Sequence, residues 1–167
     1  METVNIHYQH NNRATTELVI ELPTCKGIMI IPVQQIIRIQ SISNYSKLFF
    51  RNASPATGGG KTLVVAKVLR WFEERLSHPL HPDSYRERGA GGEGFIRIHR
   101  THLVNINYIK TYQGSKSGLL LLSNGEIFSV AKRKKSSLAE RLSNLNNSIA
   151  DASLYPSTFN TKKILAA

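Results

Sequence analysis

The chain has 167 residues, enough for one domain with a core, and its composition excludes several classes of protein. Hydrophobic residues make up 41% of it, yet no apolar run approaches the roughly 20 residues that a membrane-spanning helix needs. The single cysteine, Cys25, excludes an internal disulfide, and the polar start with Glu2 lacks the pattern of a secretory signal. We therefore expect a cytoplasmic protein without a membrane-spanning segment.

The charge is strongly basic and unevenly distributed. Lys and Arg number 22 against 11 acidic residues, a net charge of +11. Residues 95–145 hold nine of the cations and two of the acids. A concentrated cationic stretch is typical of a protein that binds a polyanion, with nucleic acid and an anionic membrane as the candidates. A basic surface without a partner is the alternative.

The first half of the chain predicts short strands and one helix. Apolar and β-branched runs predict strands at 18–22, 27–31, 36–39, 48–50 and 62–65, with a polar loop at 41–47 and a turn-rich insert at 52–60. Val68, Leu69, Phe72 and Leu76 share one helical face, so residues 68–76 predict an amphipathic helix. A long breaker-rich loop, 77–94, follows.

The second half predicts more strands and a final helix. The strands lie at 95–98, 109–112, 119–122 and 126–130, and Asn124-Gly125 predicts a two-residue type I′ turn between the last two. Leu138, Leu142, Leu145 and Ile149 predict the helix, with a loose tail beyond Asn146. The fold class is therefore mostly β, with two helices.

Patterns for catalysis or metal binding are weak. Two His-x-x-His pairs, His78 with His81 and His99 with His102, have loose spacing, so we interpret them as incidental and expect no metal. The sequence has no P-loop, dinucleotide fingerprint or nucleophile-elbow motif. We expect neither an enzyme nor a bound cofactor.

Three polar, basic segments follow predicted strands. They are Ser43 to Lys47, His99 to His102, and Ala131 to Lys135. Arg and Lys bind guanine or phosphate, and Asn, Ser and Tyr add smaller hydrogen-bonding groups. Any one segment alone fits a solvated loop equally well.

The segment Phe95 to Asn105 reads F-I-R-I-H-R-T-H-L-V-N and resembles a signature of a known family. The family signature is F-x-R-x-H-R-S-x-x-V-N of the LytTR-type DNA-binding domain, found in AlgR/AgrA/LytR-like bacterial transcriptional regulators. Ile31-Pro32 through Ile39, the pair Asn44-Tyr45, the helix at 68–76 and the hairpin from Asn124 to Val130 resemble further family elements in the same order. The resemblance covers about residues 26–145.

The resemblance implies an elongated β-β-β arrangement of small sheets with two short helices, whose loops enter successive major grooves of duplex DNA. It implies a domain at 26–145 between an N-terminal extension, 1–25, and a C-terminal tail, 146–167. The DNA-binding residues it implies are Asn44, Tyr45, Ser46, Lys47, His99, Arg100, Lys132, Arg133, Lys134 and Lys135. The implied partner is double-stranded DNA with paired direct-repeat half-sites, on which two copies bind side by side, and no membrane partner is expected.

Some alternatives stay open at this point. Lys132 stands where the family has an arginine, and lysine lacks the two-pronged contact, so Arg133 is the better base reader. The Tyr45 ring fits the core as well as a contact, and His99 fits a structural role equally well. A small basic RNA-binding protein or a protein-interaction module is the alternative function.

Overall fold

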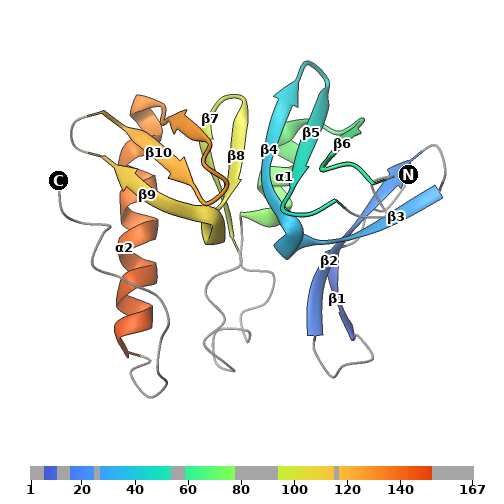
Figure 1. Ribbon diagram of the computed structural model, residues 1–167, viewed down its shortest axis with the longest axis horizontal. Coiled ribbons are helices and arrows are strands. Elements are labelled where there is room, and N and C mark those ends of the chain that lie inside the picture. Colours follow the sequence, from blue (N-terminus) through green and yellow to red (C-terminus); the bar gives the residue numbers. More distant parts are fainter. Residues whose placement is uncertain are drawn as a thin grey trace.

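The computed structural model describes residues 6–10, 16–24, 27–53, 59–77, 94–114 and 117–151. Within these residues the chain forms three antiparallel sheets and two α-helices. The sheets follow one another along the long axis of the molecule, from the blue strands through the central sheet to the orange strands (Figure 1). The predicted mostly-β class with small sheets and two helices is confirmed. No helix in the described part of the chain is both long and apolar enough to cross a membrane.

The N-terminal sheet has three strands in the order β1-β2-β3. They are β1 (Ile6–His10), β2 (Thr16–Thr24) and β3 (Gly27–Pro32). Strand β1 was not predicted, because its short IHYQH run is largely polar. Alternate residues of β2 are buried, so this strand is part of the core by packing. The boundary predicted at residue 25 therefore does not coincide with a boundary in the packing. The division into an N-terminal extension and a DNA-binding domain stays a prediction about function.

The central sheet has five strands in the order β6-β5-β4-β8-β7. A 3-10 turn, η1 (Val33–Gln35), leads into it from β3. Strand β8 was not predicted, because it covers four residues that follow β7 after a two-residue turn. The strands are β4 (Ile36–Ile42), β5 (Tyr45–Phe50), β6 (Thr62–Val65), β7 (Phe95–His99) and β8 (His102–Asn105).

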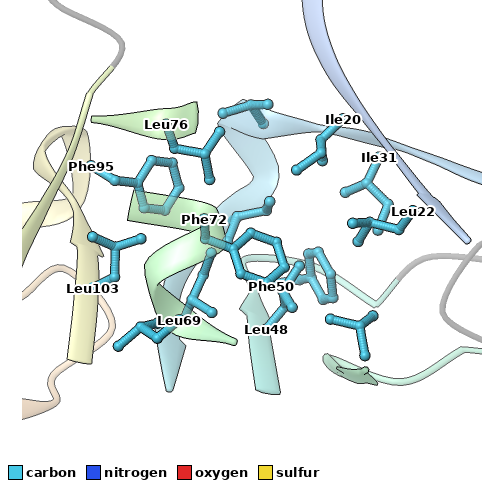
Figure 2. Close-up of a cluster of buried hydrophobic side chains, with 14 of the residues drawn as sticks. Ile20, Leu22, Ile31, Leu48, Phe50, Leu69, Phe72, Leu76, Phe95 and Leu103 are labelled. Carbon is cyan, nitrogen blue, oxygen red and sulfur yellow. The ribbon is translucent and has the colours of Figure 1, made fainter. Parts of the chain in front are cut away.

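The first core lies between the N-terminal sheet, one face of the central sheet and helix α1 (Leu69–Leu76). Figure 2 shows Phe72 of this helix among side chains from both sheets. The helix presents Leu69, Phe72 and Leu76, all buried, as the predicted amphipathic pattern requires. The loop predicted at 77–94 lies outside the described residues except at its two ends.

The second core covers the opposite face of the central sheet. It contains Leu120 and Leu122 of the C-terminal sheet and Leu138 of the last helix, all fully buried. The elements here are η3 (Ile106–Tyr108), β9 (Ile109–Gln113), β10 (Leu119–Leu122), β11 (Ile127–Ser129), η4 (Lys132–Lys134) and α2 (Lys135–Asp151). Helix α2 continues past the predicted tail boundary, and residues 152–167 lie outside the described part.

The hairpin between β10 and β11 was predicted correctly, but its turn type was wrong. A type I′ turn needs positive φ at two residues, whereas only Gly125 has it here, at 88°. Gly125 N–H donates to Leu122 O, and Leu122 N–H donates to Glu126 O, so three residues form the loop. The Asn124 side chain accepts from Glu126 N–H, which makes the longer loop a stable alternative.

Candidate functional site

The first predicted segment forms the tip of the β4–β5 hairpin. Ile42 pairs with Tyr45, so Ser43 and Asn44 are the two turn residues, and Ser43 has a φ of 53°. Asn44 is exposed, and Tyr45 is 50% exposed. The alternative that Tyr45 belongs to the core is therefore wrong. Lys47 follows on the same face of the strand and is half-buried.

Ser46 is the exception in this segment, because its side chain points to the opposite face. It alternates with Tyr45 and is in phase with the buried Leu48 and Phe50, and its exposed fraction is 0%. Its hydroxyl has no hydrogen-bond partner among the described residues. A side chain so placed cannot reach a ligand without opening the first core, so the prediction of Ser46 as a contact is wrong for this conformation.

The second segment forms the β7–β8 turn. His99 pairs with His102, and Arg100 and Thr101 make the turn, with Arg100 exposed. The Thr101 hydroxyl lies 2.8 Å from Nδ1 of His99 and 2.8 Å from Nδ1 of His102. The Thr101 N–H also donates to His99 Nδ1 at 3.4 Å, so this ring nitrogen accepts a hydrogen bond from the turn backbone. His99 is thus held by the turn and still lines the cleft described below.

His102 has a perturbed environment. Burial lowers its pKa below the usual 6.5, and the positive charge of Arg38 and the neighbouring His99 lower the pKa further, against the opposing effect of Glu126. Its ring lies 4.9 Å from the ring of Phe128 in the C-terminal sheet. His102 is therefore favoured as a neutral ring at the junction of two sheets.

The third segment lies between β11 and α2, where η4 starts the helix. Lys132 and Arg133 are exposed, and no carboxylate among the described residues pairs with either. Lys134 lies 3.9 Å from Glu73 of α1. The Lys135 side chain lies over Gly118, where an added Cβ would be 2.3 Å from Lys135 Cε. Among the described residues, Lys132 and Arg133 are thus the cations of this segment that are not engaged within the protein.

Backbone hydrogen bonds bring the three segments together. Ser41 N–H donates to Thr101 O at 2.9 Å, which joins the β4–β5 hairpin to the β7–β8 turn. Ala131 N–H donates to Ile98 O at 2.9 Å, which joins the same turn to the third segment. The two turns and the start of α2 lie along the upper edge in Figure 1. We call this row the basic edge.

A cleft lies on the basic edge between the second and third segments. Its lining residues are His99, Thr101, His102, Ile127, Phe128, Ser129, Val130, Ala131 and Lys132. The lining therefore combines two imidazoles and one ammonium group with apolar side chains. Among the described residues no group of three His, Cys, Asp or Glu could hold a metal ion, and His78 and His81 lie outside the described part.

Arg97 is a supporting residue that was not predicted from the sequence. Its guanidinium donates to the carbonyl oxygens of His99 at 3.2 Å and Arg100 at 2.7 Å, so it stabilises the β7–β8 turn. Glu73 of α1 holds it in place through an ion pair of 2.5 Å. The F-I-R-I-H pattern was the available signal, because Arg97 alternates there with apolar residues. Its side chain lies on the side of the sheet that α1 covers.

Arg38 is the second supporting residue that was missed. A bulge in β4 between Ile36 and Arg38 turns the Arg38 side chain toward the C-terminal sheet. There it donates two hydrogen bonds to Glu126, at 2.8 and 2.6 Å, and its Cζ lies 3.3 Å from the Phe49 ring centroid. The hydrogen bond from Arg38 lowers the pKa of Glu126 below 4.5. Arg38 is only 5% exposed. Its ion pair with Glu126 joins the central sheet to the C-terminal sheet behind the basic edge.

Comparisons with known proteins give a family model and a solved structure to which this chain is similar. Residues 87–143 match the family model of the LytTr DNA-binding domain. The fold is similar to a solved LytTr DNA-binding domain from Bacillus cereus, with a TM-score of 0.50 and 23% sequence identity. That alignment covers 74% of this chain and 95% of the Bacillus cereus chain. No curated protein matches the sequence.

The family match covers the second and third segments, including the whole of β7, β8 and η4. The structural match extends the likeness in fold beyond them. The resemblance that the F-I-R-I-H-R-T-H-L-V-N segment carries is thereby confirmed, and so is the LytTr-like fold.

Proposed function

We propose that this chain, which has the fold of a LytTr DNA-binding domain, binds specific sites in duplex DNA as a transcriptional regulator in the cytoplasm. The observation that carries the proposal is the basic edge, on which three turn segments from different parts of the chain lie side by side. Turns of this size fit the major groove, which displays a distinct pattern of donors and acceptors for each base pair. Residues 26–145 are the proposed DNA-binding part.

The exposure of the cations supports a division of roles. Arg133 is exposed and has no paired carboxylate among the residues that the structure describes, and its planar guanidinium suits guanine O6 and N7, so we assign it to base contact. Lys132, which lines the cleft, and Arg100 in the β7–β8 turn are assigned to phosphates or base edges within reach. Lys134 and Lys135 are partly engaged within the protein, so phosphate contact is the role that fits them.

The first and second segments complete the proposed interface. Asn44, Tyr45 and Lys47 present polar groups at the β4–β5 tip, and His99 presents its ring in the cleft. Each segment spans a few residues, so one domain touches few bases. Because each good base contact contributes about 1–3 kcal/mol, useful discrimination needs two copies on paired half-sites. We propose direct repeats spaced by about one helical turn, ~10 bp.

The first experiment compares nucleic acids. The protein is titrated against a duplex from a selected site pool, a random duplex, single-stranded DNA and RNA at several salt concentrations. If about six cations meet phosphates, log K for duplex DNA should fall with log salt at a slope of about −5. A slope near zero, or preference for RNA or single strands, would contradict the proposal, and RNA preference would favour the alternative of an RNA-binding protein.

The second experiment assigns base contact. Arg133→Ala should weaken binding to the selected site by about 1–3 kcal/mol and binding to random duplex far less. Lys110→Ala is the matched control, because Lys110 is exposed on β9 outside the basic edge and carries the same charge. Equal losses for Arg133→Ala on both duplexes would make Arg133 a phosphate contact.

The third experiment tests the paired half-sites. Five inserted base pairs should weaken binding, and ten should largely restore it, because half a helical turn places the half-sites on opposite faces of the DNA. A single half-site that binds as tightly as two would refute the pairing and leave the DNA-binding proposal intact.

A further inference from the structure

Two large apolar side chains are exposed at the tip of the β4–β5 hairpin. Ile42 is 43% exposed and Tyr45 is 50% exposed, and they pair directly across the two strands. Directly opposed residues on an antiparallel pair have Cβ atoms about 5 Å apart, so the two side chains form one apolar surface. Single exposed apolar residues need no explanation, but a pair at the end of a hairpin among polar groups does.

The strand register places this pair on the same face as the polar groups of the basic edge. Gln40 pairs with both Lys47 and His102, and Ile42 and Tyr45 follow two residues further toward the tip. Residues two apart on a strand share a face. The apolar pair therefore points to the side on which Lys47 and His102 lie, and His102 lines the cleft.

The pair extends beyond the neighbouring turn. Pairing between β4 and β8 ends at Gln40 with His102, and the last link to the β7–β8 turn is the Ser41–Thr101 hydrogen bond. Ile42 lies past this link, and Figure 1 shows the β4–β5 tip rising above the β7–β8 turn. A duplex that lies on the basic edge would meet this tip first.

We propose that Ile42, with the Tyr45 ring beside it, contacts the 5-methyl group of thymine in the major groove. This inference rests on the proposed function. The thymine methyl is the apolar feature that the major groove displays, and apolar side chains recognise it. Asn44 is exposed in the same turn, and asparagine binds the N6 and N7 atoms of adenine. The first segment thus reads A·T base pairs, and Ile42 is a specificity-determining residue.

The experiment removes the methyl group alone. In the duplex from the selected site pool, each thymine is replaced in turn by deoxyuridine, which keeps base pairing and every hydrogen-bonding group. For the unaltered protein, one or two replacements in each half-site should lower affinity by about fourfold, the effect expected for burial of one methyl group.

A variant then assigns the contact to Ile42. Ile42→Ala should bind thymine and deoxyuridine duplexes equally at the sensitive position, while its sensitivity elsewhere is unchanged. Ile28→Ala is the control, because Ile28 is 71% exposed on β3 of the N-terminal sheet, away from the basic edge. It should keep the full sensitivity to deoxyuridine. Thermal unfolding of both variants checks that the fold is retained.

The outcomes separate this inference from the proposed function. If the protein binds no duplex DNA, the proposed function fails and this inference fails with it. If it binds a selected duplex but is insensitive to deoxyuridine at every position, or if Ile42→Ala keeps the sensitivity, only the thymine contact is refuted. A selected site without thymine would also refute it.

Discussion

Each face of the central sheet carries an arginine paired with a glutamate, and the two pairs differ in burial and in what they hold. Arg38 is 5% exposed, stacks on Phe49 and donates twice to Glu126 of the β10–β11 loop. The Arg97 side chain is 23% exposed, contacts Glu73 of α1 and donates to two carbonyl oxygens of the β7–β8 turn. The first pair joins sheets, and the second shapes a turn of the basic edge.

This difference shows how a basic interface can be built on an ordinary core. The apolar clusters on both faces fix the position of the strands, as in any small β protein. The two arginines are engaged with the protein and are not the free charges of the interface. Within the described part of the chain, three exposed cations of the basic edge have no paired carboxylate, and they are Arg100 in the β7–β8 turn and Lys132 and Arg133 after β11. Stability and DNA binding should therefore respond differently to loss of each pair.

The largest effect is expected for the buried pair. Glu126→Gln removes the charge that opposes the Arg38 guanidinium and should lower the free energy of unfolding by about 2 kcal/mol, as measured by urea denaturation. A buried arginine without its carboxylate is the physical cause, because its desolvation is no longer compensated.

The double variant Arg38→Met with Glu126→Gln is the control for that prediction. It removes both charges and should be more stable than Glu126→Gln alone, because no buried charge is left unpaired. Additive losses would show that the two residues do not act as a pair.

A smaller effect on stability and a larger one on binding are expected for the second pair. Arg97→Ala frees the two carbonyl oxygens of the β7–β8 turn and should lower affinity for the selected duplex about tenfold, or about 1.4 kcal/mol, while stability falls by about 1 kcal/mol. Binding is measured by fluorescence anisotropy under conditions in which the variant is fully folded.

Arg70→Ala is the matched control on α1. Arg70 pairs with Glu74, but the two side chains are 79% and 54% exposed. Such a surface pair contributes well under about 1 kcal/mol, and the change removes the same charge as Arg97→Ala. Equal losses of affinity in the two variants would mean that Arg97 acts through net charge and not through the turn.

The sequence predicted most of the strands and both helices, and it placed three polar, basic segments at the ends of elements, while the failures have specific causes. In Tyr45 to Phe50, apolar residues occupy both alternating positions, since Phe49 and Phe50 are neighbours. The pattern therefore could not show that Ser46 faces the core. Strict alternation from Ile36 also predicts the wrong face of the sheet for the Arg38 side chain, because a bulge in β4 changes the phase of the strand.

The ion pairs were beyond sequence reasoning for another reason. Arg38 and Glu126 are 88 residues apart, and Arg97 and Glu73 are 24 apart. No local pattern pairs such residues, because their contact depends on how three sheets and a helix pack. The basic segments could be predicted because each is continuous in the chain and lies beside a motif with fixed spacing.

The smallest effect is expected for His102, which lies where the buried pair meets the cleft. The groups that face it are Arg38, His99, Glu126 and the Thr101 hydroxyl. Its pKa is lower in the folded chain than in the unfolded chain, mainly because of burial, so the unfolded chain binds the proton more readily. Stability should therefore fall as the pH drops below 6.5, the usual histidine value.

His102→Gln removes this titration, so its stability should fall less than that of the unaltered protein between pH 7 and pH 5.5, measured by thermal unfolding across the series. Glu126 does not interfere in this window, because its lowered pKa lies below 4.5 and its pairing with Arg38 is lost only at more acidic pH. The double variant His102→Gln with Glu126→Gln should have the same dependence of stability on pH as His102→Gln above pH 5.5. Below pH 5.5 it should lose less stability than His102→Gln. If His102→Gln leaves the slope above pH 5.5 unchanged, another group titrates there, and burial of His102 is not coupled to the stability of the junction between the two sheets.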